Sequence, residues 1–188
     1  WLDNVSNLPG SIADFVDMLH SVDPNLTIAI NKSKAYFTDD DGSYLYVDSD
    51  GIDDQDDRDY KIIKHIPLNA YGDITAGHIT PLGQGAPPNS WAYEEYTLPN
   101  MAETPWVTYE DSNKPILKHA WFPIRNSWSG SNAELIFSTE QAYRFVRTIT
   151  DGGAAMTWST TQEKGHMPDA ELAIMAEISN RMTQNPMP

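Results

Sequence analysis

Hydrophobic residues along the chain follow two spacings, one typical of amphipathic helices and one typical of buried strands. Apolar positions three and four residues apart predict helices over about 12–19, 142–149 and 168–182. Each predicted helix begins at a recognisable signal: the capping-box pairs Ser11 with Asp14 and Ser138 with Gln141, and the helix-opening Pro168. These start signals fix the three helices better than propensity alone would.

Short apolar runs without room for a helix predict strands that are buried on both faces. They cover residues 1–2, 26–31, 60–66, 116–122 and 154–159. Strands alternating with helices predict an α/β fold, in which a parallel sheet is covered by helices. The later part of a (β/α)8 barrel gives this order, and so does a doubly wound open sheet. The sequence Gly-Gln-Gly at 83–85 is too short for the phosphate loop that would favour the open sheet.

Two segments break the regular pattern. Residues 38–59 are rich in Asp and look like an acidic insertion. Residues 78–115 contain six prolines and little periodicity, which predicts a long structured loop with one short helix near 92–96. Long loops on a regular scaffold often carry function.

Composition narrows the class of protein. With 188 residues, 40% of them hydrophobic, the chain can build one ordinary domain, and no apolar run is long enough to cross a bilayer. Cysteine is absent, which excludes thiol chemistry and disulfides. The net charge of −15 argues against nucleic-acid and anionic-membrane partners. Because the chain starts inside a strand, we expect it to be a piece of a longer polypeptide.

Two motifs resemble a known enzyme family. The opening Trp1-Leu2-Asp3-Asn4 is similar to the Trp-Phe-Asp-Gly type motif that ends barrel strand four in α-L-fucosidases of glycoside hydrolase family 29. The runs Ser-Thr-Glu-Gln-Ala-Tyr-Arg-Phe-Val at 138–146 and Gly-Gly-Ala-Ala-Met-Thr-Trp at 152–158 resemble that family's closing segment. The related family 107 endo-fucanases share this barrel. The resemblance implies a partial (β/α)8 barrel, approximately strands 4 to 8, with residues 1–188 forming the C-terminal part of one domain.

The resemblance also implies catalytic residues. It places the nucleophile of a retaining mechanism on Asp3, whose alternative role is to cap the following loop. His78 ends a strand-like segment about where the second group should fall, and a His titrates near neutral pH, which suits an acid/base that gives and takes a proton. A Glu remains one alternative for this second group, from the set Glu94, Glu95, Glu103 and Glu110. The other is that neither serves and His78 is only hydrogen-bonded in a loop.

A basic and aromatic cluster predicts substrate contacts. It consists of Lys118, His119, Trp121, Arg125 and Trp128. Indole faces stack on sugar rings, and cationic side chains pair with sulfate or carboxylate groups. The alternative is that Trp121 belongs to the core and the charges form a solvated face. Two further indoles in the long loop, Trp91 and Trp106, are weaker candidates for lining a cleft.

The acidic insertion is a candidate metal site. Asp48, Asp50 and Asp53 are closely spaced oxygen donors beside a turn-forming Gly, an arrangement that Ca²⁺ favours. The segment does not match an EF-hand, and a solvated acidic loop is the competing interpretation. The proposed chemistry requires no cofactor, so Ca²⁺ would have a structural role only.

Together these features predict a retaining glycoside hydrolase that cleaves α-L-fucosidic bonds in a fucose-containing polysaccharide, with or without sulfate groups. An exo-acting α-L-fucosidase is one alternative. A non-catalytic carbohydrate-binding protein, in which Trp121 and Trp128 bind sugar and Asp3 has no chemical role, is another. The expected location is secreted, periplasmic or at the cell surface.

Overall fold

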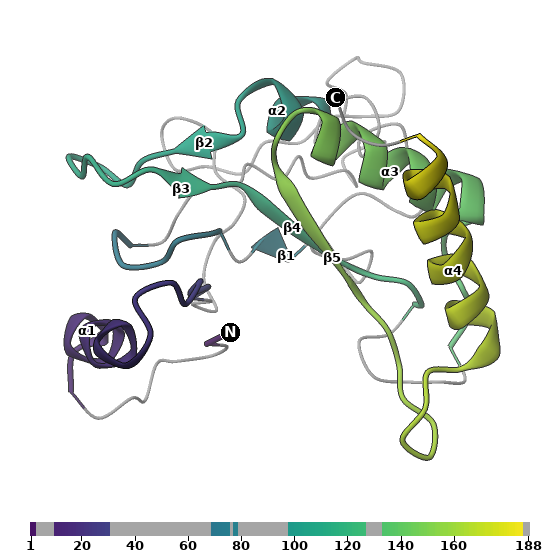
Figure 1. The fold of residues 1–188 in the computed structure, drawn as a ribbon, viewed down its shortest axis with the longest axis horizontal. Coiled ribbons are helices and arrows are strands. Elements are labelled where there is room, and N and C mark those ends of the chain that lie inside the picture. Colours follow the sequence, from purple (N-terminus) through teal and green to yellow (C-terminus); the bar gives the residue numbers. More distant parts are fainter. Residues whose placement is uncertain (3–9, 31–68, 76, 79–97, 127–132, 186–188) are drawn as a thin grey trace, which may run out of the picture.

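The computed structural model describes residues 1–2, 10–30, 69–75, 98–126 and 133–185, together with the backbone of 77–78 (Figure 1). Several sequence predictions fall outside these ranges. They are Asp3, the acidic insertion with Asp48, Asp50 and Asp53, the strand at 60–66, Trp91, the helix near 92–96, Glu94, Glu95 and Trp128.

Four helices and five strands make up the described regions. In chain order they are α1 (Ile12–Val22), β1 (Gly77–His78), α2 (Leu98–Glu103), β2 (Trp106–Val107), β3 (Ile116–Leu117), β4 (His119–Pro123), α3 (Thr139–Asp151), β5 (Ala155–Ser159) and α4 (Asp169–Gln184). Strands β1, β4 and β5 form a parallel sheet in that order, whereas β2 and β3 pair antiparallel. The predicted α/β class with parallel strands is therefore confirmed, in the form of small sheets.

Isolated parallel bridges join further segments of the chain beside this sheet. Leu2 bridges Ile30, Ala29 bridges Ile74, and Ile74 bridges Leu117. Backbone hydrogen bonds support these pairings, for example from Leu2 N to Ala29 O at 2.8 Å. Five segments from different parts of the chain thus run parallel and lie side by side in sequence order.

Local signals start the helices where the sequence predicts. Ser11 caps α1, and its hydroxyl accepts a hydrogen bond from Asp14 N at 3.0 Å. At α3 the capping box is complete, because the Ser138 hydroxyl accepts from Gln141 N while the Gln141 side chain accepts from Ser138 N. Each cap satisfies backbone donors that a helix leaves unpaired at its first turn.

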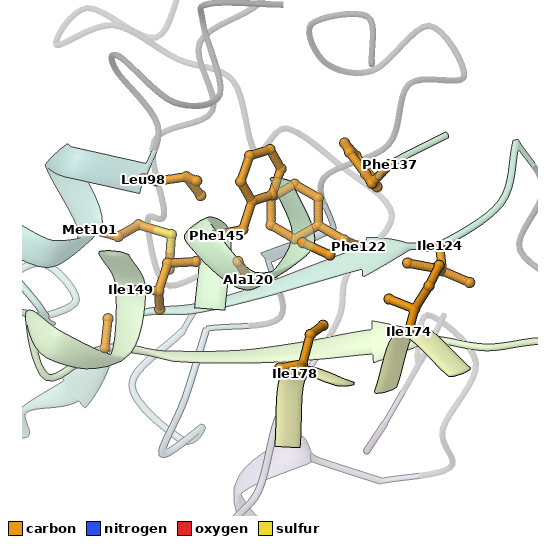
Figure 2. Close-up of a cluster of buried hydrophobic side chains, with 12 residues drawn as sticks. Leu98, Met101, Ala120, Phe122, Ile124, Phe137, Phe145, Ile149, Ile174 and Ile178 are labelled. Carbon is orange, nitrogen blue, oxygen red and sulfur yellow. The ribbon is translucent and has the colours of Figure 1, made fainter. Parts of the chain in front are cut away.

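The main hydrophobic core lies between β4, β5 and the helices α2, α3 and α4 (Figure 2). Its centre comes from alternate residues of β4, Ala120 and Phe122, and from Ile124 directly after the strand, each of them 0% exposed. The Phe122 ring lies 5.4 Å from the Phe145 ring and 5.5 Å from that of Trp158. This face of the sheet is therefore buried by the helices and is not open to a ligand.

A separate cluster forms around α1. Val16, Ile28 and Ile30 are buried there, with Leu2 and Leu19 packed against them. Figure 1 shows α1 on the side of the sheet away from α3 and α4. The cluster joins the helix to the strand segment that carries Ile28 and Ile30.

The region predicted as a long loop contains regular structure that the sequence pattern did not reveal. Helix α2 is only six residues long, and it forms because Leu98 and Met101 are buried against the core. The backbones of α2 and α3 approach closely, since a Cβ added at Gly152 would lie 2.3 Å from the Cα of Ala102. Tertiary packing, not periodicity, thus selects this helix.

Candidate active site

Strand β4 presents a second set of side chains on the face opposite the core. Successive side chains on a strand point to opposite faces, so His119 and Trp121 lie across the sheet from Ala120 and Phe122. In the parallel register, Trp121 pairs with Thr157 of β5. The predicted candidates His119 and Trp121 therefore share one surface, and Thr157 joins them.

Trp1 completes an aromatic cluster on this surface. Its ring meets that of Trp121 edge-on, with centroids 4.6 Å apart, and that of His119 with centroids 5.4 Å apart. Trp1 is 47% exposed, so the cluster offers an indole to solvent beside a buried imidazole. The first residue of the chain is thus brought beside a strand far along the sequence.

The backbone and ring of His119 are held by residues on either side of β4: Thr75, just before β1, and Thr157 of β5. The Thr75 hydroxyl accepts from His119 N at 2.8 Å and donates to His119 O at 3.1 Å. Atom Nε2 of the ring lies 2.8 Å from the Thr157 hydroxyl, and only 3% of the residue is exposed. An imidazole fixed in this way has a defined orientation toward the surface that Trp1 and Trp121 form.

His78 is level with this cluster along the sheet. Its backbone pairs with Trp121 in the parallel ladder between β1 and β4. Asp3 follows Leu2 directly in the sequence, and Leu2 bridges the neighbouring segment at Ile30. The roles predicted for Asp3 and His78 remain predictions, because the described side chains include neither.

Lys118 lies apart from the cluster. Its ammonium donates to the Thr104 hydroxyl at 2.7 Å and to the Asn100 side-chain oxygen at 3.2 Å, which ties β4 to α2. Burial lowers the pKa of the Lys118 ammonium. The substrate contact predicted for this residue stays a prediction, while the observed contacts hold the start of β4.

Arg125 is likewise engaged inside the protein. Its Nε donates to Glu171 of α4, and another nitrogen of its guanidinium donates to Ala133 O at 2.6 Å. Glu171 is fully buried and also accepts from the backbone and hydroxyl of Thr161, at 2.7 and 2.5 Å. Although burial alone raises the pKa of Glu171, the hydrogen bonds from Thr161 and Arg125 lower it overall.

The remaining predicted groups lie elsewhere. Glu103 ends α2, and Glu110 lies between β2 and β3, so both precede β4 in segments near its start. Trp106 of β2 is 57% exposed. Within the described ranges there is no cluster of three or more His, Asp or Glu that could hold a metal ion. Among the helices described, none is long and apolar enough to cross a membrane.

Sequence reasoning did not single out Trp1 or Thr157 as site residues. Trp1 was expected only as part of a strand, and its contacts with β4 depend on pairings across the whole sheet. Thr157 was a recognisable signal, because it is a polar residue between Met156 and Trp158 in an otherwise apolar run. A polar side chain that alternates with packed ones marks the open face of a strand.

Comparisons with known proteins agree with this arrangement. The family profile described as "Mef1: Endo-alpha(1,4)-fucoidanase Mef1" matches residues 1–188. The structure titled "Endo-fucoidan hydrolase P5AFcnA from glycoside hydrolase family 107" is 70% identical, with a TM-score of 0.83 over 100% of this chain and 51% of that one. "Endo-fucoidan hydrolase MfFcnA4 from glycoside hydrolase family 107" is 17% identical and shares the fold, with a TM-score of 0.57 over 89% of this chain and 23% of that one. No curated protein matches the chain.

The parallel strands and the two structural neighbours define the class as the α/β fold of family 107 glycoside hydrolases. Within that class, the chain belongs to the Mef1 endo-α(1,4)-fucoidanase family. The resemblance to family 107 found in the sequence is thereby confirmed. The chain spans about half the length of the P5AFcnA chain that it matches.

Proposed function

We propose that this chain is the C-terminal part of the catalytic domain of a retaining glycoside hydrolase that cleaves α-L-fucosidic bonds within a fucose-containing polysaccharide. The observation that carries the proposal is the 70% identity, over the whole chain, to a protein titled an endo-fucoidan hydrolase. A chain this similar is expected to keep the same catalytic groups at the same places in the fold.

The parallel segments support a partial (β/α)8 barrel. Segments at Leu2, Ile30, Ile74, β4 and β5 are neighbours in chain order, as strands 4 to 8 of such a barrel would be. Helices α3 and α4 cover the outer face of β4 and β5, and the cluster of Trp1, His119 and Trp121 lies on the other. In this proposal the acidic segment 38–59 is an insertion within the single domain.

The proposed chemistry uses two groups. The Asp3 carboxylate attacks the anomeric carbon while protonated His78 donates its proton to the departing glycosidic oxygen, which leaves a glycosyl ester on Asp3. Neutral His78 then removes a proton from water, the water oxygen attacks the same carbon, and the Asp3 carboxylate is released. The register of His78 with Trp121 supports this role, because it places the residue beside the aromatic cluster.

The aromatic cluster is proposed to bind the sugar next to the cleaved bond. Trp1 offers an exposed ring, and sugar C–H faces stack on indoles. His119 remains a proposed contributor, held beside the two indoles by Thr75 and Thr157. Trp128, Lys118 and Arg125 remain proposed contributors to substrate binding. The contacts of Lys118 with Thr104 and of Arg125 with Glu171 would act indirectly, by holding the two ends of β4.

The test is the Asp3→Asn variant of the full-length protein, assayed on fucoidan. We expect turnover to be lost while oligosaccharide binding is retained, since the amide keeps the shape of the carboxylate but is a poor nucleophile. Asp17→Asn, on the exposed side of α1, is the matched control and should leave turnover unchanged. Turnover by Asp3→Asn at the wild-type rate would remove Asp3 as nucleophile.

Product analysis separates the alternatives. Internal cleavage releases a range of oligosaccharides and shortens the polymer early, whereas an exo-acting α-L-fucosidase releases fucose from chain ends. Nuclear magnetic resonance of the first product should show the same anomeric configuration as the substrate if the mechanism is retaining. A wild-type protein that binds fucoidan without any turnover would favour the carbohydrate-binding alternative.

A further inference from the structure

The turn between β5 and α4 carries a lysine that has no hydrogen-bond or ion-pair partner among the described residues. Among the seven Lys and Arg side chains in the described ranges, six form hydrogen bonds or ion pairs with other groups. The exception is Lys164, which is exposed and has no such contact with any described residue. The chain has a net charge of −15, so a lysine that pairs with none of the described carboxylates is available to bind an anionic group from outside.

The turn holds Lys164 in a fixed and unfavourable backbone conformation. Glu163 and His166 exchange two backbone hydrogen bonds, of 2.7 and 2.9 Å. Between them, Lys164 has φ 51° and Gly165 has φ 82°, as the two central residues of a type I′ turn do. Asn, Asp or Gly is the usual choice at the first of these positions, so a Lys there is retained at a cost in stability.

The place of the turn links it to the proposed site. Figure 1 shows it projecting beyond the C-terminal end of β5, the end at which α/β proteins bind ligands. Its base is anchored, because Thr161 bonds twice to the buried Glu171. Arg125, the other cation past the end of a described parallel strand, is occupied by the same Glu171.

We propose that Lys164 recognises sulfate ester groups on the polysaccharide and sets the preference of the enzyme for sulfated over unsulfated chains. The ammonium forms charge-assisted hydrogen bonds with sulfate oxygens, which compensates for the repulsion between an anionic polymer and an acidic protein. This inference rests on the proposed function, because it names a determinant of the polymer that the site receives.

The test compares KM for a sulfated fucan with KM for its chemically desulfated form, in the full-length enzyme. We expect Lys164→Gln to raise KM for the sulfated polymer by about threefold to tenfold. The same variant should leave kcat unchanged, and it should leave KM for the desulfated polymer unchanged. Lys164→Arg should preserve the preference. Arg144→Gln, which removes the same charge from exposed α3, is the matched control and should change neither KM.

Lys164→Gly separates charge from backbone strain. It should raise the midpoint of thermal unfolding, because Gly accepts positive φ without cost, and yet weaken binding to the sulfated polymer as Lys164→Gln does. Equal KM values for Lys164→Gln and Arg144→Gln, or an equal effect on both polymers, would overturn the inference. If the wild type hydrolysed neither polymer, the proposed function itself would fail, and the two failures are thus distinguishable.

Discussion

Replacing Glu171 by Ala should be among the most destabilising single changes in the C-terminal half of the chain. The carboxylate is fully buried and accepts hydrogen bonds from Thr161 and from Arg125, whose side chain is only 11% exposed. Removing one partner of a buried ion pair leaves the other charge uncompensated, which costs about 3–5 kcal/mol. We therefore expect the free energy of unfolding to fall by about that amount.

A second carboxylate on the same helix provides the control. Glu177 pairs with Arg181 at 2.8 Å, but its side chain is 44% exposed, and Arg181 also bonds to Glu140. Exposed pairs contribute about 0–1 kcal/mol, so Glu177→Ala should lower stability only slightly. Urea unfolding of the full-length protein, followed by tryptophan fluorescence, measures both variants in one assay.

Two further variants test the cause. Glu171→Gln keeps the size and one acceptor oxygen but removes the charge, so its cost should fall between those of the wild type and Glu171→Ala. In an Arg125→Met background, Glu171→Ala should cost markedly less, because no buried charge remains to be stranded. A cost for Glu171→Ala no larger than that of Glu177→Ala, or full additivity with Arg125→Met, would refute the reasoning.

Two other changes test the packing and the electrostatics of the described regions. Gly152→Ala should cost about 1–3 kcal/mol of unfolding free energy, because the new methyl would lie 2.3 Å from the Cα of Ala102 and force α2 away from α3. Gly153→Ala should cost about 1 kcal/mol through backbone strain alone, because this residue has positive φ and the new methyl would meet only Pro105 Cγ, at an ordinary contact distance of 3.9 Å. The pKa of Asp73 is lowered: burial raises it, but the hydrogen bond from Lys114 and other favourable contacts outweigh burial. The ionised carboxylate therefore stabilises the fold above its unfolded pKa of about 4, and this contribution is lost as pH falls through the folded value. The stability difference between wild type and Asp73→Asn, from urea unfolding at several pH values, should shrink at acid pH; a constant difference would contradict the assignment.

The sequence allowed the capped helices and buried strands to be predicted because their signals are local. Ser138 and Gln141 lie within one helical turn of each other, and the apolar run of β5 needs no distant partner to be recognised. Helix α2 could not be predicted in this way. Its six residues show no useful periodicity, and its formation depends on burying Leu98 and Met101 against a helix some 40 residues later.

The candidate site was predictable in part for the same reason. Lys118, His119 and Trp121 are close in sequence, so they were grouped as one substrate-binding set, but strand alternation sends Lys118 toward α2 and the other two toward the open face. Arg125 was included because its charge suits sulfate. Its partner Glu171 lies 46 residues further along, on a helix face that periodicity alone marks as apolar.

Strand β4 therefore couples stability to the proposed chemistry through a single backbone. Ala120 and Phe122 fix the strand against α3 and α4, and this fixes the height and direction of His119 and Trp121 on the opposite face. Substitutions that change side-chain volume at Ala120 or Phe122 should disturb the site indirectly, by moving the strand. Changes on the open face should alter ligand contacts while the core stays packed, because alternating side chains share a backbone but not neighbours. Activity measured beside stability can thus assign each β4 residue to one face of the sheet.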